Sequence, residues 1–157
     1  MLHFFKQIAM SKQLFSTADQ LKIVEAIKLA EKQTSGEVRV HIEPTCIIDP
    51  VERALQVFTE LKMDATELKN GVLIYLATED KKFAIIGDKG IHEKVQDSFW
   101  NEAKELMKVN FVKGDFTAGL TEAIGKVGEK LKLFFPFQSN DADELSNEIS
   151  FGKDTNA

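Results

Sequence analysis

Acidic and amide side chains stand at the boundaries of three predicted strands, and their chemistry points to a bound cation. Glu37 begins the first strand, Asn70 precedes the second, and Asp88 follows the third. Asp64 and Glu67 lie on the loop that leads to Asn70. Carboxylates gathered at one place repel one another unless they are protonated or bridged by a cation. Oxygen ligands of this kind suit Ca²⁺ or Mg²⁺ rather than zinc.

The same residues also have a purely structural interpretation. Acidic side chains at the ends of helices and strands often cap a turn or lie in water. Asp64 could cap a turn, and Glu67 could be solvated. Metal binding is therefore a hypothesis that depends on whether the three strand ends meet in space.

Three segments have the pattern of β-strands. Residues 37–43 alternate between apolar residues and polar ones such as Arg39 and His41, which predicts a strand with one buried face. Residues 72–77 and 83–86 are apolar on both faces, as in strands covered by helices on each side. A short polar link joins the last two, so they are predicted to form an antiparallel hairpin.

Helical patterns fill the chain around these strands. Thr17 and Gln20 match a capping box for a helix over residues 17–33. A second helix is predicted between the first two strands, and a third over about residues 91–109, where apolar residues recur at helical spacing. Asp115 is placed to cap a last helix, which leads to the end of the folded part.

The connections decide where the strand ends lie. A helix joins the first two strands, so they should run parallel with a right-handed crossover, while the third runs back. The starts of the first two strands and the end of the third then share one end of the sheet. We therefore predict that Glu37, Asn70 and Asp88 meet there. The acids at the opposite end, Asp49 and Asp80 among them, are interpreted as turn and cap residues.

Composition limits the classes of function. A chain of 157 residues suits one domain. The net charge of −5, with lysines scattered among glutamates, argues against a nucleic-acid partner. The single Cys46 cannot form an internal disulfide, which fits a reducing compartment. No apolar run approaches the roughly 20 residues that span a bilayer, and the first ten residues lack the pattern of a signal peptide. We expect a cytoplasmic protein without membrane insertion.

The folded domain is predicted to cover residues 1–136. Residues 137–157 are rich in Asp, Glu, Asn and Ser, which predicts an acidic, flexible C-terminal tail. Its apolar residues Leu145, Ile149 and Phe151 could still dock on the domain.

Short motifs at the strand ends resemble those of TPM domains. The segment SGEVRV, residues 35–40, resembles their first strand, and NGVLIY, residues 70–75, resembles their "NGVL" strand. The segment KFAIIGDKGI, residues 82–91, is similar to the exit of their hairpin. The match continues through Phe99-Trp100, Lys113-Gly114-Asp115-Phe116 and Gly119-Leu120, and it covers about residues 10–136. The ordered set is similar to the TPM-domain family, in a short form without a leader or membrane segment.

The resemblance implies an α/β fold of the Rossmann-like kind: a three-layer α/β/α sandwich with a mixed parallel and antiparallel sheet of about four strands. It also implies a divalent metal in a shallow cleft. By position, Glu37, Asn70 and Asp88 match that site best, and Asp64 and Glu67 match it less closely. The chain has Gly-Asp-Lys-Gly where many relatives have Gly-Tyr-Gly, so that an additional acid stands at the hairpin exit. The family includes a thylakoid-lumen protein linked to photosystem II repair and described as an acid phosphatase.

Three functions follow as hypotheses. The first is a Ca²⁺- or Mg²⁺-binding domain that acts as a binding or regulatory module without strong catalysis, and that recognises a protein or a phosphorylated small molecule. The alternative is a weak metal-dependent phosphomonoesterase. No catalytic residue is assigned for it, because Cys46 and Arg53 lack the spacing and the intervening residues of a cysteine phosphatase loop. The third is a protein-interaction scaffold that uses the acidic tail.

Overall fold

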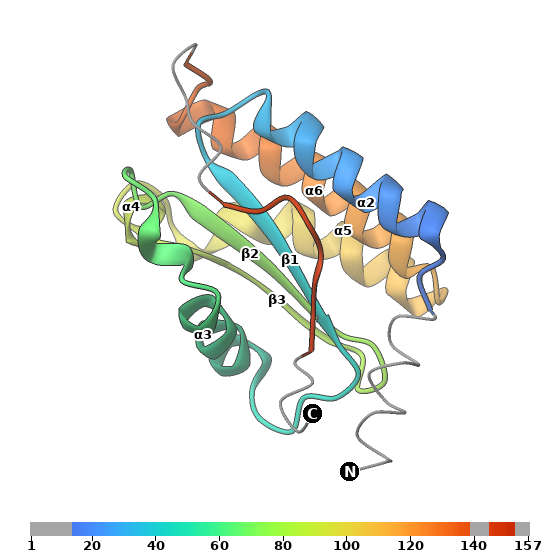
Figure 1. Cartoon of the computed structure of the whole chain (residues 1–157). Helices are drawn as coiled ribbons and strands as arrows, with labels where there is room; N and C mark the ends of the chain where they lie inside the picture. Colours follow the sequence, from blue (N-terminus) through green and yellow to red (C-terminus); the bar gives the residue numbers. More distant parts are fainter. Residues whose placement is uncertain (1–13, 139–144, 153–157) are drawn as a thin grey trace.

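The computed structural model describes residues 14–138 and 145–152, whose helices and strands are drawn in Figure 1. In chain order the elements are α2 (Thr17–Glu31), β1 (Glu37–Glu43), α3 (Pro50–Glu60), the 3-10 turn η1 (Met63–Ala65), β2 (Gly71–Ala77), β3 (Lys82–Gly87), α4 (Lys89–His92), the 3-10 turn η2 (Asp97–Trp100), α5 (Asn101–Val112), α6 (Phe116–Phe134) and β4 (Ser150–Phe151).

The four strands form one mixed sheet in the order β3-β2-β1-β4. β1 and β2 are parallel, and β2 and β3 form the predicted antiparallel hairpin. These two pairings confirm the topology from which the position of the strand ends was derived. β4 adds a parallel edge strand through two residue pairs, His41 with Ser150 and Ile42 with Phe151.

Helices cover both faces of the sheet. Figure 1 shows α3 on one face and α2, α5 and α6 on the other. All seven residues of β2 are buried, as expected for a central strand between two helical layers. Alternate residues of β1 and β2, such as Val40 and Ile74, pack toward α2 and α6, while Leu73 and Tyr75 pack toward α3. The result is the three-layer α/β/α sandwich that was predicted.

Two helical predictions need correction. The cap of α2 is Ser16 rather than Thr17, because the Ser16 hydroxyl accepts from Asp19 N at 3.0 Å and the Asp19 carboxylate accepts from Ser16 N at 3.3 Å. The helix predicted over residues 91–109 is divided into α4, η2 and α5. Gln96 is extended there, with φ −93° and ψ 166°, so the chain turns before Trp100 enters the core.

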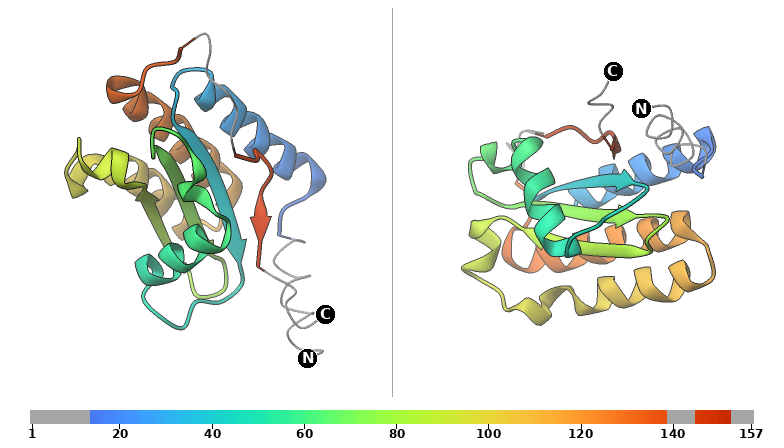
Figure 2. Two further views of the ribbon diagram at one scale, coloured as in Figure 1. Left: turned by 60° about the vertical axis from the view of Figure 1, so that its left-hand side comes forward. Right: turned by 90° about the horizontal axis from the view of Figure 1, so that it is seen from below.

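Residues 145–152, here called the strap, also differ from the prediction. They were assigned to a flexible tail, but they lie along the edge of β1 and include β4, as Figure 2 shows. Leu145 packs against the core on the α3 side, and Ile149 and Phe151 pack against the core on the other side. Of the remaining tail residues, 139–144 and 153–157 lie outside the described residues.

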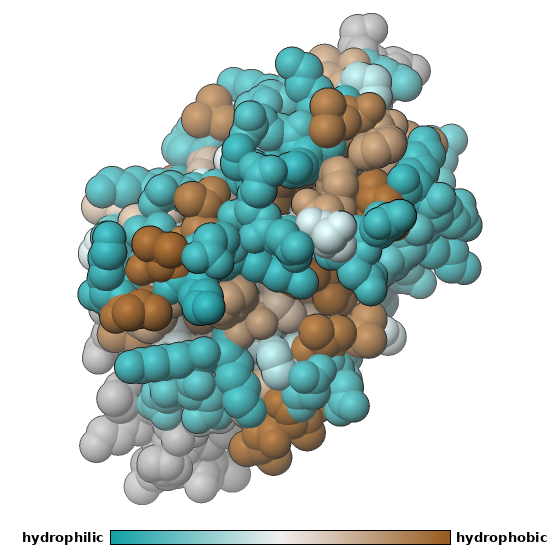
Figure 3. All heavy atoms as spheres, turned by 180° about the vertical axis from the view of Figure 1, so that it is seen from behind, coloured by the Kyte–Doolittle hydropathy of each residue, from teal (hydrophilic) through white to brown (hydrophobic). Residues whose placement is uncertain are grey.

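On the side opposite to the view of Figure 1, exposed apolar side chains lie singly or in small groups among polar residues rather than as one large face (Figure 3). Scattered exposed apolar residues are normal for a globular domain. Within the described part of the chain, no helix has the length and apolarity needed to cross a membrane.

Candidate functional site

The sheet brings three of the predicted ligands to one edge. Glu37 lies directly across from Gly71 in the β1–β2 pairing, and the Glu37 amide donates to the Asn70 carbonyl at 3.3 Å. On the other side of β2, the Asp88 amide donates to the Gly71 carbonyl at 2.9 Å. Glu37 and Asp88 therefore flank Gly71, and their side chains leave the same face of the sheet.

The two carboxylates at this edge are both buried, but their hydrogen bonds differ. Asp88 is 8% exposed and caps α4, where its Oδ1 accepts from Lys89 N at 2.8 Å. The other oxygen, Asp88 Oδ2, is buried and has no hydrogen-bond donor among the described residues. Glu37 is 3% exposed, and its Oε1 accepts from the amide of Leu145 in the strap at 2.5 Å.

The structure separates the remaining predicted ligands by burial. Asn70 is buried, with its amide nitrogen Nδ2 at 3.5 Å from Ser35 Oγ and its backbone N–H donating to Thr66 Oγ1 at 3.3 Å. Asp64 and Glu67 are exposed on the preceding loop. Glu37, Asn70 and Asp88 are thus the buried members of the predicted set, here called the edge, and Asp64 and Glu67 are its exposed members.

A close backbone contact fixes the position of Asp88 relative to Asn70. The Gly90 amide donates to the Lys69 carbonyl at 2.9 Å. A Cβ atom at Gly90 would lie 2.3 Å from the Leu68 carbonyl oxygen and 2.6 Å from that of Lys69. Only glycine permits this approach. The loop before β2 and the turn after β3 are therefore held against each other.

The oxygen donors of this edge fit a hard cation better than a zinc-type ion. In the described residues, no group of three or more His, Cys, Asp and Glu side chains is arranged to hold a metal. The edge instead offers two carboxylates and the amide of Asn70. Mg²⁺ commonly binds through one or two carboxylates and keeps several waters. The unsatisfied Asp88 Oδ2 is suited to that mode of binding.

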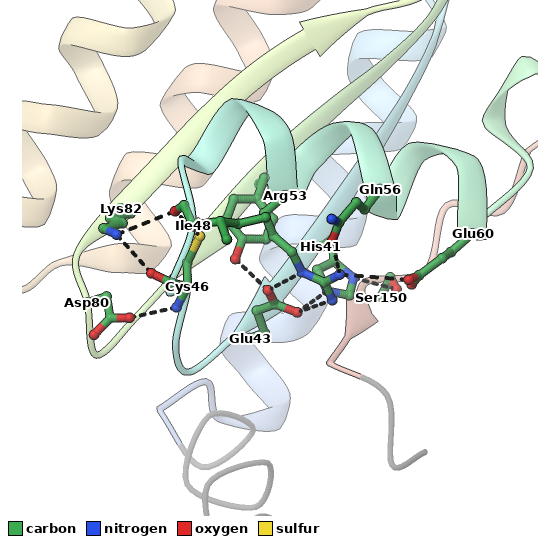
Figure 4. Close-up of polar contacts among 11 residues, drawn as sticks. His41, Glu43, Cys46, Ile48, Arg53, Gln56, Glu60, Asp80, Lys82 and Ser150 are labelled. Carbon is green, nitrogen blue, oxygen red and sulfur yellow. Dashed lines mark hydrogen bonds and ion pairs between the residues drawn. The ribbon is translucent and has the colours of Figure 1, made fainter.

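A second polar cluster, which the sequence did not predict, lies at the opposite end of β1 (Figure 4). Glu43 Oε2 accepts from Arg53 Nε at 2.8 Å and from the Tyr75 hydroxyl at 2.5 Å, while its Oε1 accepts from Arg53 Nη2 at 2.9 Å. His41 Nε2 lies 3.0 Å from Glu43 Oε1, and His41 Nδ1 lies 2.9 Å from Ser150 Oγ. The face of β1 predicted to be exposed is therefore buried, with His41 only 2% exposed.

The charges of this cluster are fixed by their neighbours. Burial alone would raise the pKa of Glu43, but hydrogen bonds from Arg53, His41 and Tyr75 lower that pKa to about 2. The pKa of Tyr75 is raised by burial and by its bond to Glu43. An ionised carboxylate and a neutral phenol that satisfy each other are poor acids and bases near neutral pH. We interpret the cluster as a structural tie between β1, β2 and α3.

The structural interpretation of the opposite end of the sheet is confirmed. Cys46 is 3% exposed, its Sγ lies 3.1 Å from the Ile48 carbonyl, and its amide donates to Asp80 Oδ2 at 2.6 Å. Asp49 caps α3 by accepting from the amides at the start of that helix. Asp115 caps α6 in the same manner. These acids are occupied as caps and turn acceptors.

We expect Cys46 to be unreactive in the folded protein. Its thiol is enclosed by α3 and the hairpin, so a thiol reagent such as dithionitrobenzoate should react only after local opening. Labelling in buffer should be at least tenfold slower than labelling in denaturing urea. Equal rates in the two conditions would mean that the loop before α3 opens freely.

Comparison with known proteins identifies the family to which this chain belongs. The sequence matches the family described as the TPM domain over residues 8–130. The chain belongs to the TPM-domain family. This TPM domain is similar to the NMR structure of the BA42 protein from the psychrophilic bacterium Bizionia argentinensis, with 49% identity, a TM-score of 0.83, and coverage of 88% of this chain and 95% of that one.

A second solved structure shares the fold of the TPM domain. It is the N-terminal domain of the cg2496 protein from Corynebacterium glutamicum, which has 16% identity and a TM-score of 0.60, with 84% of this chain and 80% of that chain covered. A search of curated proteins found no match.

Proposed function

We propose that this TPM domain binds a divalent cation, Mg²⁺ or Ca²⁺, at the edge formed by Glu37, Asn70 and Asp88, and that it acts as a binding or regulatory module. The observation that carries the proposal is the buried Asp88 Oδ2, which lacks a hydrogen-bond donor in the described residues. A buried carboxylate oxygen without a partner is costly unless a cation or a proton satisfies it.

The surroundings of Asp88 favour a role in cation binding over a purely structural role. The first oxygen of Asp88 is used in capping α4, so the second is free for another role. Backbone hydrogen bonds link Glu37 to Asn70 and Asp88 to Gly71, so the three side chains lie at the same end of the sheet. Few protein ligands and several waters would complete the coordination, so we expect weak binding, in the millimolar to submillimolar range typical of loosely held ions.

A binding role fits the edge better than catalysis does. Cys46, the thiol whose position near Arg53 raised the question of phosphatase chemistry, lies beyond Glu43 at the opposite end of β1. The cation would supply a positive charge at which an anionic group of a protein or a phosphorylated small molecule could bind. Asp64 and Glu67 are exposed on the loop that precedes Asn70, and we propose that they add water-mediated ligands.

Replacing Asp88 by asparagine should weaken cation binding. The D88N substitution keeps the size and the helix-capping oxygen but removes the charge that attracts the ion. In a titration with MgCl₂ or CaCl₂ followed by amide NMR, the wild-type shifts should concentrate at residues 37, 70 and 88. The variant should lose at least tenfold in affinity.

The matched control is D115N. Asp115 also caps a helix through one carboxylate oxygen, which accepts from Ala118 N at 3.0 Å, but it does not belong to the edge. This variant should bind the cation like the wild type. If D88N and D115N both titrate like the wild type, or if the shifts appear elsewhere in the domain, the proposed site is wrong.

A further inference from the structure

The strap runs along β1 from the proposed cation site, at the start of that strand, toward the end of the strand. Its first residue, Leu145, donates its amide to Glu37 Oε1 at 2.5 Å. Its far end is anchored on β1 by the Ser150 hydroxyl at 2.9 Å from His41 Nδ1 and by the Gly152 amide, which donates to the Ile42 carbonyl at 2.8 Å. One carboxylate of the site is thus engaged by a segment more than 100 residues away in sequence.

The Leu145 side chain lies over Gly71, the residue between Glu37 and Asp88 in the sheet. Glu37, Gly71 and Asp88 are neighbours across three strands, so the backbones of Glu37 and Asp88 are about 10 Å apart, twice the spacing of adjacent strands. A Cβ atom built at Gly71, midway between them, would lie 3.5 Å from Leu145 Cδ1 and 3.2 Å from the Met63 carbonyl oxygen. Leu145 and Met63 therefore cover the face of Gly71.

An ion shared by both carboxylates needs that same space. Ca²⁺ and Mg²⁺ bind oxygens at roughly 2.0 to 2.6 Å, so the two carboxylates would have to turn toward each other over Gly71. The docked Leu145 prevents this, and its amide holds one Glu37 oxygen. With the strap in place, Asp88 can offer its oxygen to a cation, but Glu37 and Asp88 cannot share one.

The strap has the structural marks of a segment that can detach. None of its eight residues is fully buried. Asn147 and Glu37 line an open cavity of about 450 Å³, and Ile149 and Phe151 line another of about 290 Å³ against α2. Its pairing with β1 extends over only two residues. Segments with few buried contacts open at a lower free energy than the core does.

We infer that the strap is an autoinhibitory segment of the cation site: when docked it limits the site to Asp88, and when released it lets Glu37 and Asp88 hold the ion together. This inference rests on the proposed function. Because linkage is reciprocal, a cation that binds the open form more tightly must also displace the strap.

Two variants of the full chain test the inference without altering a proposed ligand. S150A removes the anchor to His41 at the far end of the strap, and L145A removes the side chain over Gly71. Loss of one hydrogen bond shifts an opening equilibrium by roughly 3- to 10-fold, and apparent affinity rises with the open fraction. Both variants should therefore bind Mg²⁺ or Ca²⁺ about 3- to 10-fold more tightly than the wild type does.

The control substitution is S146A. Ser146 is an exposed strap residue whose hydroxyl accepts from Glu148 N within the strap, at 3.1 Å. It should leave affinity unchanged. In the wild type, saturating MgCl₂ or CaCl₂ should also accelerate hydrogen exchange of the Gly152 amide about 3- to 10-fold. The reason is that release of the strap breaks the hydrogen bond from this amide to the Ile42 carbonyl.

The outcomes separate this inference from the proposal beneath it. If S150A and L145A bind the cation no more tightly than the wild type, or more weakly, and the Gly152 amide stays protected in the bound state, the strap is not inhibitory although the cation site stands. If neither the wild type nor any variant responds to the cation, both the site and its regulation are overturned.

Discussion

Replacing Glu43 by glutamine should cost about 3 kcal/mol of unfolding free energy, because it discharges the buried carboxylate of the ion pair with the half-buried Arg53. The carboxylate accepts from Arg53, Tyr75 and His41, so the glutamine would leave the guanidinium without its counter-charge. Domains of this size are stable by about 5–15 kcal/mol. Urea unfolding followed by circular dichroism or tryptophan fluorescence would measure a loss of that size directly.

The same variant should flatten the response of stability to acid. In the folded protein the pKa of Glu43 is about 2, against an ordinary value of 4.5. The stabilisation is therefore fully present above about pH 4.5 and is lost as the pH falls toward 2. At about 1.4 kcal/mol for each pH unit, this amounts to roughly 3 kcal/mol. The Glu43→Gln protein should lack that part of the decline.

Glu60→Gln serves as the control for Glu43→Gln. Glu60 also approaches Arg53, at 3.7 Å from Nη1, but its side chain is 35% exposed. An exposed pair of this kind contributes about 0–1 kcal/mol. If the two variants lose equal stability, the burial of Glu43 is not what makes its ion pair important.

Replacing Gly90 by alanine should destabilise the domain by about 1–3 kcal/mol, the usual cost of forcing an atom into a packed site. The added Cβ would meet two backbone carbonyls, those of Leu68 and Lys69, and backbone cannot rotate away as a flexible side chain can. The turn that carries Asp88 and the loop that carries Asn70 would have to separate. Amide NMR should show shifts concentrated at residues 66–71 and 88–91, together with weaker cation binding.

The same substitution at Gly125 should have the opposite sign. Gly125 lies within α6, and a Cβ atom there would meet nothing within 4 Å. Alanine is favoured over glycine in a helix by up to about 1 kcal/mol, so Gly125→Ala should raise the urea midpoint. If the Gly90→Ala protein is as stable as the wild type, the contact with residues 68 and 69 does not hold the Asp88 turn in place.

The arrangement of β1, β2 and β3 was predictable because it depends on local patterns. The buried hairpin is marked by two apolar runs with a short link, and the connection rules then determine which strand ends share an edge. The meeting of Glu37, Asn70 and Asp88 follows from these two steps. The hydrogen bond from the Leu145 amide to Glu37 could not be predicted in this way, because Leu145 comes from a segment whose composition predicts a flexible tail.

The features that were missed depend on contacts between distant residues. In the sequence, His41 and Glu43 have the pattern of the exposed face of a half-buried strand. That face is buried because Arg53 from α3 binds Glu43 and Ser150 from β4 binds His41. The turn at Gln96 is likewise invisible to periodicity, because Ile91, Val95 and Phe99 keep helical spacing across it. A signal was available for the first case: one side of β1 carries only ionisable residues, Glu, Arg, His and Glu at positions 37, 39, 41 and 43, and Arg53 follows in the next helix.

The late position of β4 in the chain has a consequence during synthesis on the ribosome. The strand it pairs with, β1, is complete more than 100 residues earlier, so a nascent chain that has finished α6 still presents the outer backbone groups of β1 to its surroundings. An unpaired strand edge is a template for association with other chains. β4 therefore protects part of this edge only after the rest of the sheet has been made, and proteins truncated before Ser150 should be prone to self-associate even when the helical layers have folded.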